Sequence, residues 1–183
     1  MKKIWIAGLL TVCSMNNVYG QGKILTNDGI ISFYTHTVIE DITATHQNVA
    51  SVIDAASGEV AIIVTMTGFQ FEKKLMQEHF NENYVESHKY PKATFSGKIE
   101  NNSRVNYQQP GTYPVQVSGE MTIHGVTRAV STEGSIEIKP KGIIANTKFM
   151  LNPEDYGIRI PRVVRKNIAE KMEITAQLVL NPS

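Results

Sequence analysis

Hydrophobic and polar residues change their spacing between residues 71 and 99, and this change is the strongest structural signal in the chain. Before Pro91 the apolar residues recur at helical spacing, and they comprise Phe71, Leu75, Met76, Phe80 and Tyr84. After Pro91 the period falls to two, with one face formed by Ala93, Phe95, Gly97 and Ile99. The pattern predicts an amphipathic helix over 71–82, followed by a strand that is buried on one face.

Segments with the alternation of a strand, bounded by turn residues, dominate the rest of the chain. Strands are expected over 29–35, 39–46, 49–54, 59–69, 93–99, 112–123, 126–138, 142–151 and 172–180. Because His124 and Gly125 separate two alternating segments, they predict a β-hairpin turn. The last strand can close a barrel. The chain as a whole therefore has an all-β pattern with one inserted helix.

The segment over 59–69 is apolar on both faces. Val60, Ile62 and Val64 fill one face, and Ala61 and Ile63 contribute to the other. Strands of this kind are normally covered on both sides. We therefore expect the helix over 71–82 to pack on the barrel wall and cover this strand.

The N-terminal residues have the features of an export signal. Lys2 and Lys3 precede an apolar run that ends near Cys13, and Gly20 is a small residue at a suitable cleavage position. The run is shorter than the roughly 20 apolar residues that span a bilayer. We interpret residues 1–20 as a signal peptide and 21–183 as one domain, located in the periplasm or secreted. Acylation of Cys13 is the alternative, although Val12 is larger than the residue that normally precedes a lipidated cysteine.

Charge and cysteine content exclude several functions. The chain of 183 residues has a formal net charge of +1, and removing Lys2 and Lys3 brings it to about −1, so nothing favours nucleic acid. Without Cys13, the only cysteine, the mature chain has no disulfide, iron–sulfur ligand or thiol nucleophile.

The five histidines form no close pair of the kind found at zinc sites. No nucleophile elbow or phosphate loop is present, so we expect no metal and no catalysis.

Two motifs resemble those of a known family. They are Tyr90-Pro91-Lys92-Ala93-Thr94-Phe95, and the hairpin that runs from Gly119 to Arg128. On the basis of these two motifs, the chain resembles the YceI-like family of exported, lipocalin-like bacterial proteins. The resemblance extends from about residue 29 to residue 180. The resemblance implies an extended, antiparallel, eight-stranded β-barrel with a short helical crossover. It also implies that the lumen holds a polyisoprenoid, an isoprenoid quinone or a fatty acyl derivative, with no required cofactor. Small inward residues, such as Gly97, Gly119, Ala93 and Ala176, would leave room for a slim chain.

Candidate ligand-binding residues follow from this implication. Aromatic, leucine and methionine side chains on the apolar registers are candidates to line the lumen: Phe33, Phe69, Phe71, Leu75, Met76, Phe80, Tyr84, Phe95, Met121 and Phe149. Ordinary core packing is the alternative. A basic segment before the last strand could hold a phosphate head group, and it contributes Arg159, Arg162 and Arg165. A solvated loop is the alternative for this segment.

Two functions of different kinds fit these observations. The first is non-catalytic binding, storage or transport of a long-chain amphiphilic lipid, with no integral membrane association; a homodimer could extend its tunnel. The second is an exported protein-interaction or stress-response module. The two differ in the lumen, because the module should fill its core by packing Phe33, Phe95 and Met121 against one another.

Overall fold

The computed structural model describes residues 22–36, 41–160 and 171–180. The predicted signal peptide lies outside the described residues. The described part of the chain forms nine strands and one short α-helix: β1 (Lys23–Thr35), β2 (Ile42–Asp54), β3 (Glu59–Thr65), β4 (Gln70–Phe71), α1 (Lys74–His79), β5 (Lys92–Ile99), β6 (Gly111–Ile123), β7 (Val126–Lys139), β8 (Gly142–Leu151) and β9 (Met172–Leu180). No helix in these residues has the length and apolar character needed to span a membrane.

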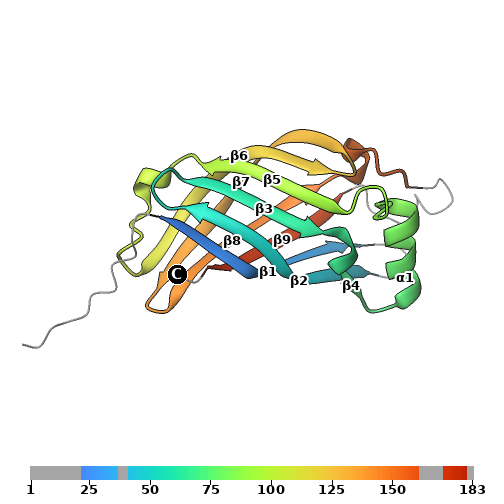
Figure 1. Cartoon of the computed structure of the whole chain (residues 1–183), viewed down its shortest axis with the longest axis horizontal. Helices are drawn as coiled ribbons and strands as arrows, with labels where there is room; N and C mark the ends of the chain where they lie inside the picture. Colours follow the sequence, from blue (N-terminus) through green and yellow to red (C-terminus); the bar gives the residue numbers. More distant parts are fainter. Residues whose placement is uncertain (1–21, 37–40, 161–170, 181–183) are drawn as a thin grey trace, which may run out of the picture.

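Eight of the described strands close into an antiparallel barrel (Figure 1). The order is β1-β2-β3-β5-β6-β7-β8-β9, and β9 pairs with β1 to complete the circle. The two-residue strand β4 only adds a short pairing to β2, opposite Ala44 and Thr45. The predicted all-β, eight-stranded barrel is confirmed. The predicted hairpin is also present between β6 and β7, where His124 and Gly125 both have positive φ values of 51° and 74°.

Three strand boundaries differ from the prediction. β3 ends at Thr65 rather than at residue 69, because a 3-10 helix over Met66–Gly68 interrupts the extended backbone. β1 begins at residue 23 rather than 29, because the polar residues near Asp28 are accommodated by register shifts on either side of Gly29 instead of ending the strand. The segments 39–46 and 49–54 were predicted as separate strands, whereas β2 is continuous from residue 42 to residue 54. Its pairing with β1 holds both halves in one strand, although the residues between them are polar.

The predicted position of the helix is wrong. The α-helix is shorter than expected and continues as a π-helical turn over Phe80–Tyr84. This helical segment lies across one end of the barrel rather than along its wall (Figure 1). The outer face of β3 is therefore uncovered, and the side chain of Ile63 is 46% exposed. The apolar stripe of the helix faces the mouth of the barrel instead, with Met76 and Phe80 lining the interior.

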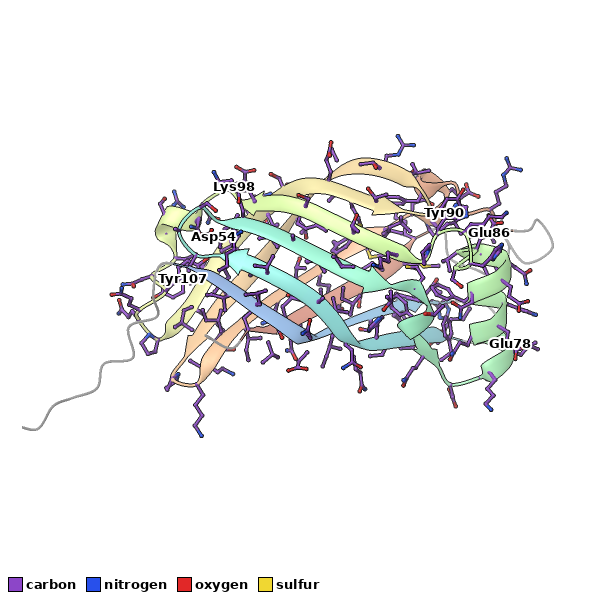
Figure 2. The ribbon with its side chains drawn as sticks, viewed as in Figure 1. Asp54, Glu78, Glu86, Tyr90, Lys98 and Tyr107 are labelled. Carbon is purple, nitrogen blue, oxygen red and sulfur yellow. The ribbon has the colours of Figure 1, made fainter. Side chains whose placement is uncertain are left out.

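The two ends of the barrel differ (Figure 2). The end that carries Asp54 and Tyr107 holds side chains that are less than 2% exposed. They include Ile99, whose backbone bonds to Gly58 next to Asp54, and the paired residues Ile143 and Leu180. The opposite end carries Glu78, Glu86 and Tyr90 and is covered by the helical segment. The candidate functional site lies between these two ends.

Candidate functional site

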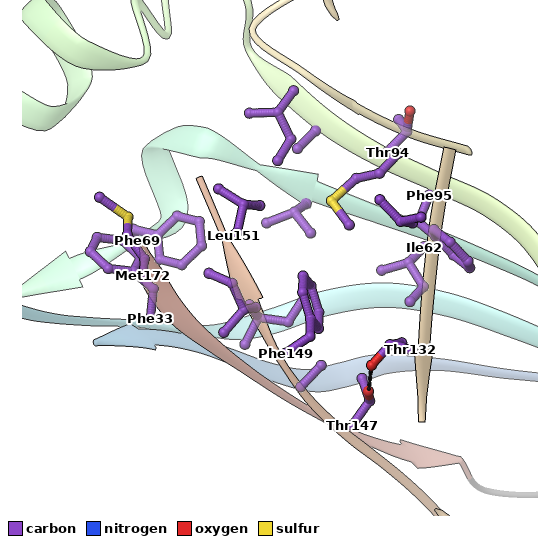
Figure 3. Close-up of a pocket in the computed structure, with 18 of the residues that line it drawn as sticks. Phe33, Ile62, Phe69, Thr94, Phe95, Thr132, Thr147, Phe149, Leu151 and Met172 are labelled. Carbon is purple, nitrogen blue, oxygen red and sulfur yellow. Dashed lines mark hydrogen bonds between the residues drawn. The ribbon is translucent and has the colours of Figure 1, made fainter. Parts of the chain in front are cut away.

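A cavity of about 460 Å³ occupies the lumen of the barrel. All eight barrel strands and the helical segment contribute to its lining. Figure 3 shows Ile62, Phe95 and Phe149, which come from β3, β5 and β8, around the same space. Cavities that bind small molecules in proteins typically measure about 300–1,000 Å³ and are largely apolar. This cavity therefore has the size and the character of a ligand site.

The lining of the cavity carries no fully charged side chain. Among the described lining residues there is no lysine, arginine, aspartate or glutamate. The polar groups are hydroxyls, one amide and one imidazole, and they belong to Thr35, His79, Tyr84, Thr94, Ser131, Thr132, Ser135, Asn146 and Thr147. An ion in such a lumen would lose its hydration without gaining a counterion, which costs several kcal/mol or more. The part of a ligand that enters the lumen should therefore be neutral.

Four phenylalanine rings close the cavity at the helical end. The ring centroid of Phe33 lies 5.5 Å from that of Phe69, 5.6 Å from that of Phe71 and 5.6 Å from that of Phe80. Phe71 and Phe80 are 5.1 Å apart. These separations are typical of favourable aromatic pairs. The rings come from β1, from the segment before the helix and from the π-helical turn, so they join the helical segment to the barrel.

A buried histidine supports this phenylalanine cluster from outside the cavity. The His46 side chain is almost fully buried, and its ring lies edge-on to Phe69 at 5.6 Å. The backbone N–H of Asn48 donates to Nδ1 of His46 over 3.1 Å, so the proton of a neutral ring is on Nε2, which lies 3.0 Å from Oγ1 of Thr65. Burial lowers the pKa of His46, which keeps the ring neutral. Gly68 is required beside it, because a Cβ atom there would overlap the imidazole.

Polar contacts fix the rim of the barrel around the β6–β7 turn. Nε2 of His124 lies 3.0 Å from Oε2 of Glu86, which follows the helical segment. Nδ1 of His124 lies 3.3 Å from the carbonyl oxygen of Tyr156, which follows β8. Hydrogen bonds from Lys89 and from His124 lower the pKa of the Glu86 carboxyl group. His124 thus connects three segments that lie far apart in the sequence.

Nine of the ten predicted lumen residues line the cavity. They are Phe33, Phe69, Phe71, Met76, Phe80, Tyr84, Phe95, Met121 and Phe149. The exception is Leu75, which is 61% exposed and is not among the lining residues, because the helix turns Met76 toward the lumen instead. Contact of the nine with a ligand stays a prediction.

The basic head-group candidates do not lie in the cavity lining as far as the structure describes them. Arg159 is exposed and is not among the lining residues. Arg162 and Arg165 lie outside the described residues. A phosphate clamp by these three side chains stays a prediction.

The small residues expected to widen the lumen divide into two pairs. Ala93 and Ala176 line the cavity. Gly97 and Gly119 instead face each other across β5 and β6, where a Cβ atom on either residue would collide with the neighbouring strand. The two glycines allow a close approach of the strands rather than enlarging the cavity.

A pair of threonines in the lining was not among the residues predicted from the sequence. Thr132 and Thr147 face the lumen from β7 and β8, and their hydroxyl oxygens are 3.1 Å apart (Figure 3). Their positions carry a signal, because Thr132 falls on the same alternating register as Val130 and Ile136. Selecting only large apolar side chains left these hydroxyls out of the candidate set.

Several solved structures resemble this barrel. A polyisoprenoid-binding domain from Saccharophagus degradans, implicated in plant cell wall breakdown, superposes with a TM-score of 0.75 at 13% identity, covering 90% of this chain and 100% of that one. BcnA of Burkholderia cenocepacia gives a TM-score of 0.70 at 14% identity, covering 82% of this chain and 95% of that one. The YceI protein of Campylobacter jejuni gives 0.63 at 15% identity, covering 81% and 89%. At these identities the likeness shows the fold.

Sequence comparison supplies the family. No curated protein matches this sequence. The model of the YceI-like domain matches residues 23–180, which include every strand of the barrel. The chain therefore belongs to the YceI-like family.

Proposed function

We propose that this protein binds a long-chain amphiphilic lipid in the barrel lumen and stores or transports it without chemical change. The observation that carries the proposal is the apolar cavity of about 460 Å³, lined by every barrel strand and free of charged side chains among the described lining residues. Candidate ligands are polyisoprenoids, isoprenoid quinones and neutral fatty acyl derivatives. The polyisoprenoid-binding domain of Saccharophagus degradans, which has the same fold, supports this choice.

Burial of the apolar chain would supply the affinity. Each buried methylene group contributes about 0.8 kcal/mol, so about ten of them supply a gross gain of about 8 kcal/mol. Loss of translational, rotational and chain freedom reduces this figure substantially. The resulting net binding free energy suits a carrier, because a ligand bound with moderate affinity can still be released.

The cavity favours the carrier over the protein-interaction module. The module was expected to fill its lumen by packing Phe33 against Phe95 and Met121. Phe33 instead packs into the phenylalanine cluster at the helical end, while Phe95 and Met121 are partners across β5 and β6 that line the open part of the lumen. Such an arrangement leaves space that a filled core would not.

The carrier would act outside the cytoplasm. In the proposal, residues 1–20 direct export and are removed, and the barrel then works in the periplasm or after secretion. A carrier in this location would shield an apolar chain from water between membranes or between a membrane and its user.

Native mass spectrometry tests the proposal. The mature protein is purified under non-denaturing conditions from the cells that produce it, weighed intact, and then extracted with organic solvent for lipid identification. We expect a stoichiometric adduct that is a long isoprenoid or acyl chain. An unliganded mass, together with no binding of added polyprenols or quinones, would contradict the proposal and favour the interaction module.

A further inference from the structure

The barrel wall divides between β7 and β8 on the side of the helical segment. Pairing between these strands runs from Lys139↔Gly142 to Gly134↔Thr147. Beyond that pair β7 continues as far as Val126 and pairs with β6, while β8 continues as far as Leu151 and pairs with β9. Within the described residues no further β7–β8 pair follows. The last pair therefore marks the apex of a gap in the hydrogen-bonded wall.

The cavity reaches the wall at this apex. Ser131 and Thr132 line the cavity from β7, and Asn146 and Thr147 line it from β8. The cavity therefore borders the place where the β7–β8 pairing ends. Farther out along the gap, Nε of Arg128 donates to the carbonyl oxygen of Asp155 over 3.0 Å and connects its two edges.

Two threonine hydroxyls at the apex form a directed chain of hydrogen bonds. Oγ1 of Thr147 lies 2.7 Å from the carbonyl oxygen of Glu133, and that oxygen can only accept. The single proton of Thr147 is therefore used there. Oγ1 of Thr132 lies 3.1 Å from Oγ1 of Thr147 and 3.2 Å from the same carbonyl oxygen. Whichever of the two it donates to, Thr132 receives no proton from Thr147.

This chain leaves Oγ1 of Thr132 as an acceptor at the cavity wall. A hydroxyl oxygen has one proton and two acceptor positions. The proton of Thr132 is committed within the chain, whereas its acceptor positions remain available to a group in the lumen. A ligand O–H or N–H could donate to it without breaking any hydrogen bond of the protein. A ligand carbonyl would have to take the Thr132 proton from its present partner, which exchanges one hydrogen bond for another.

We propose that the Thr132–Thr147 pair is a head-group subsite that accepts a hydrogen bond from a neutral ligand O–H or N–H. The inference rests on the proposed function and makes it more specific. Such a subsite favours long-chain alcohols and amides over quinones, because quinone oxygens can only accept hydrogen bonds. It also disfavours carboxylates, because they would bring a charge into a lumen that has no charged side chain among the described lining residues. The apolar chain would then extend from the subsite along the lumen.

Farnesol and farnesyl methyl ether provide a matched pair of probes. The two share one isoprenoid chain and differ in the hydroxyl proton that the subsite would accept. A net hydrogen bond of about 0.5–1.5 kcal/mol corresponds to about a 2- to 10-fold difference in Kd. We expect the full mature protein to bind farnesol more tightly than the ether by this factor in isothermal titration calorimetry.

Substitutions in β7 localise the effect. Thr132→Val keeps the shape of the side chain, and it should remove the preference for farnesol while binding of the ether changes little. Thr132→Ser keeps the hydroxyl and should keep the preference, which separates loss of the acceptor from loss of folding. Thr127→Val is the matched control, because Thr127 forms a similar hydroxyl pair with Thr122 at 2.8 Å on the exposed outer face of the same hairpin. It should leave the preference intact.

The outcomes separate this inference from the proposed function. If the unmodified protein binds both probes equally, or if Thr132→Val keeps the preference, the subsite is refuted and lipid binding stands. If the unmodified protein binds neither these probes nor longer polyprenols and quinones, lipid binding itself is refuted, and the subsite with it.

Discussion

Filling the cavity should weaken ligand binding without weakening the fold, and Ala145→Leu provides a direct test. Ala145 lines the cavity from the middle of β8, between Ile136 on β7 and Leu178 on β9. A leucine there would place three additional carbon atoms in space that a ligand would otherwise occupy. In a lumen that is already filled, the same substitution would have no room.

The expected magnitude follows from apolar burial. Three carbon atoms at about 0.8 kcal/mol each displace about 2.4 kcal/mol of ligand burial, which corresponds to roughly a 50-fold increase in Kd. The unliganded protein should not be destabilised, because the new side chain contacts the walls of an existing cavity. Overpacking of a filled core would instead cost about 1–3 kcal/mol.

Calorimetric titration with farnesol and thermal unfolding of the unliganded protein measure the two effects separately. Thr175→Leu is the control, because Thr175 is exposed on β9 and is not among the cavity-lining residues. It should leave the Kd unchanged. A destabilised Ala145→Leu protein that keeps full affinity would refute the assignment of this space to the ligand.

Three further predictions concern stability and the rim. The buried, neutral His46 has a lowered pKa, so the unfolded chain binds a proton at this histidine before the folded protein does as the pH falls. The free energy of unfolding should therefore be complete above about pH 6.5 and fall below that pH by at most about 1.4 kcal/mol per pH unit. His46→Gln should remove this slope in urea titrations at several pH values. Gly119→Ala should cost about 1–3 kcal/mol because its Cβ would collide with Gly97 on β5, whereas Gly111→Ala, which meets only ordinary contacts, should change the urea midpoint little. The exposed Arg159 is not among the lining residues, so Arg159→Gln should leave the Kd for farnesol unchanged; a tenfold loss would place the head group at this residue instead.

Periodicity along the sequence was enough to predict most of the barrel. The inward faces of β5, β6 and β9 follow directly from strict alternation, because a strand with one buried face must repeat every two residues. The turn at His124 and Gly125 was also visible, since the residue pair interrupts two alternating segments and includes a glycine. These are local properties, and local properties can be read from neighbouring residues.

The placement of the helix depended on contacts between distant segments. An apolar stripe shows that a helix packs against something, but the stripe is the same whether the helix covers the barrel wall or its mouth. Contacts of the Phe80 ring with the rings of Phe33 and Phe69 place the helical segment at the mouth of the barrel. The start of β1 was missed for a similar reason, because its pairing with β2 continues past the polar residues around Asp28.

By itself, then, the sequence determined the strands, their inward faces and most of the apolar side chains that line the lumen. Only the tertiary structure decided that the lumen stays open, that phenylalanine rings from separate segments close one end, and that the β7–β8 pairing stops at Thr147. The physical reason is that alternation fixes which face of a strand is buried, whereas the volume left between eight such faces depends on strand register and side-chain packing across the whole barrel.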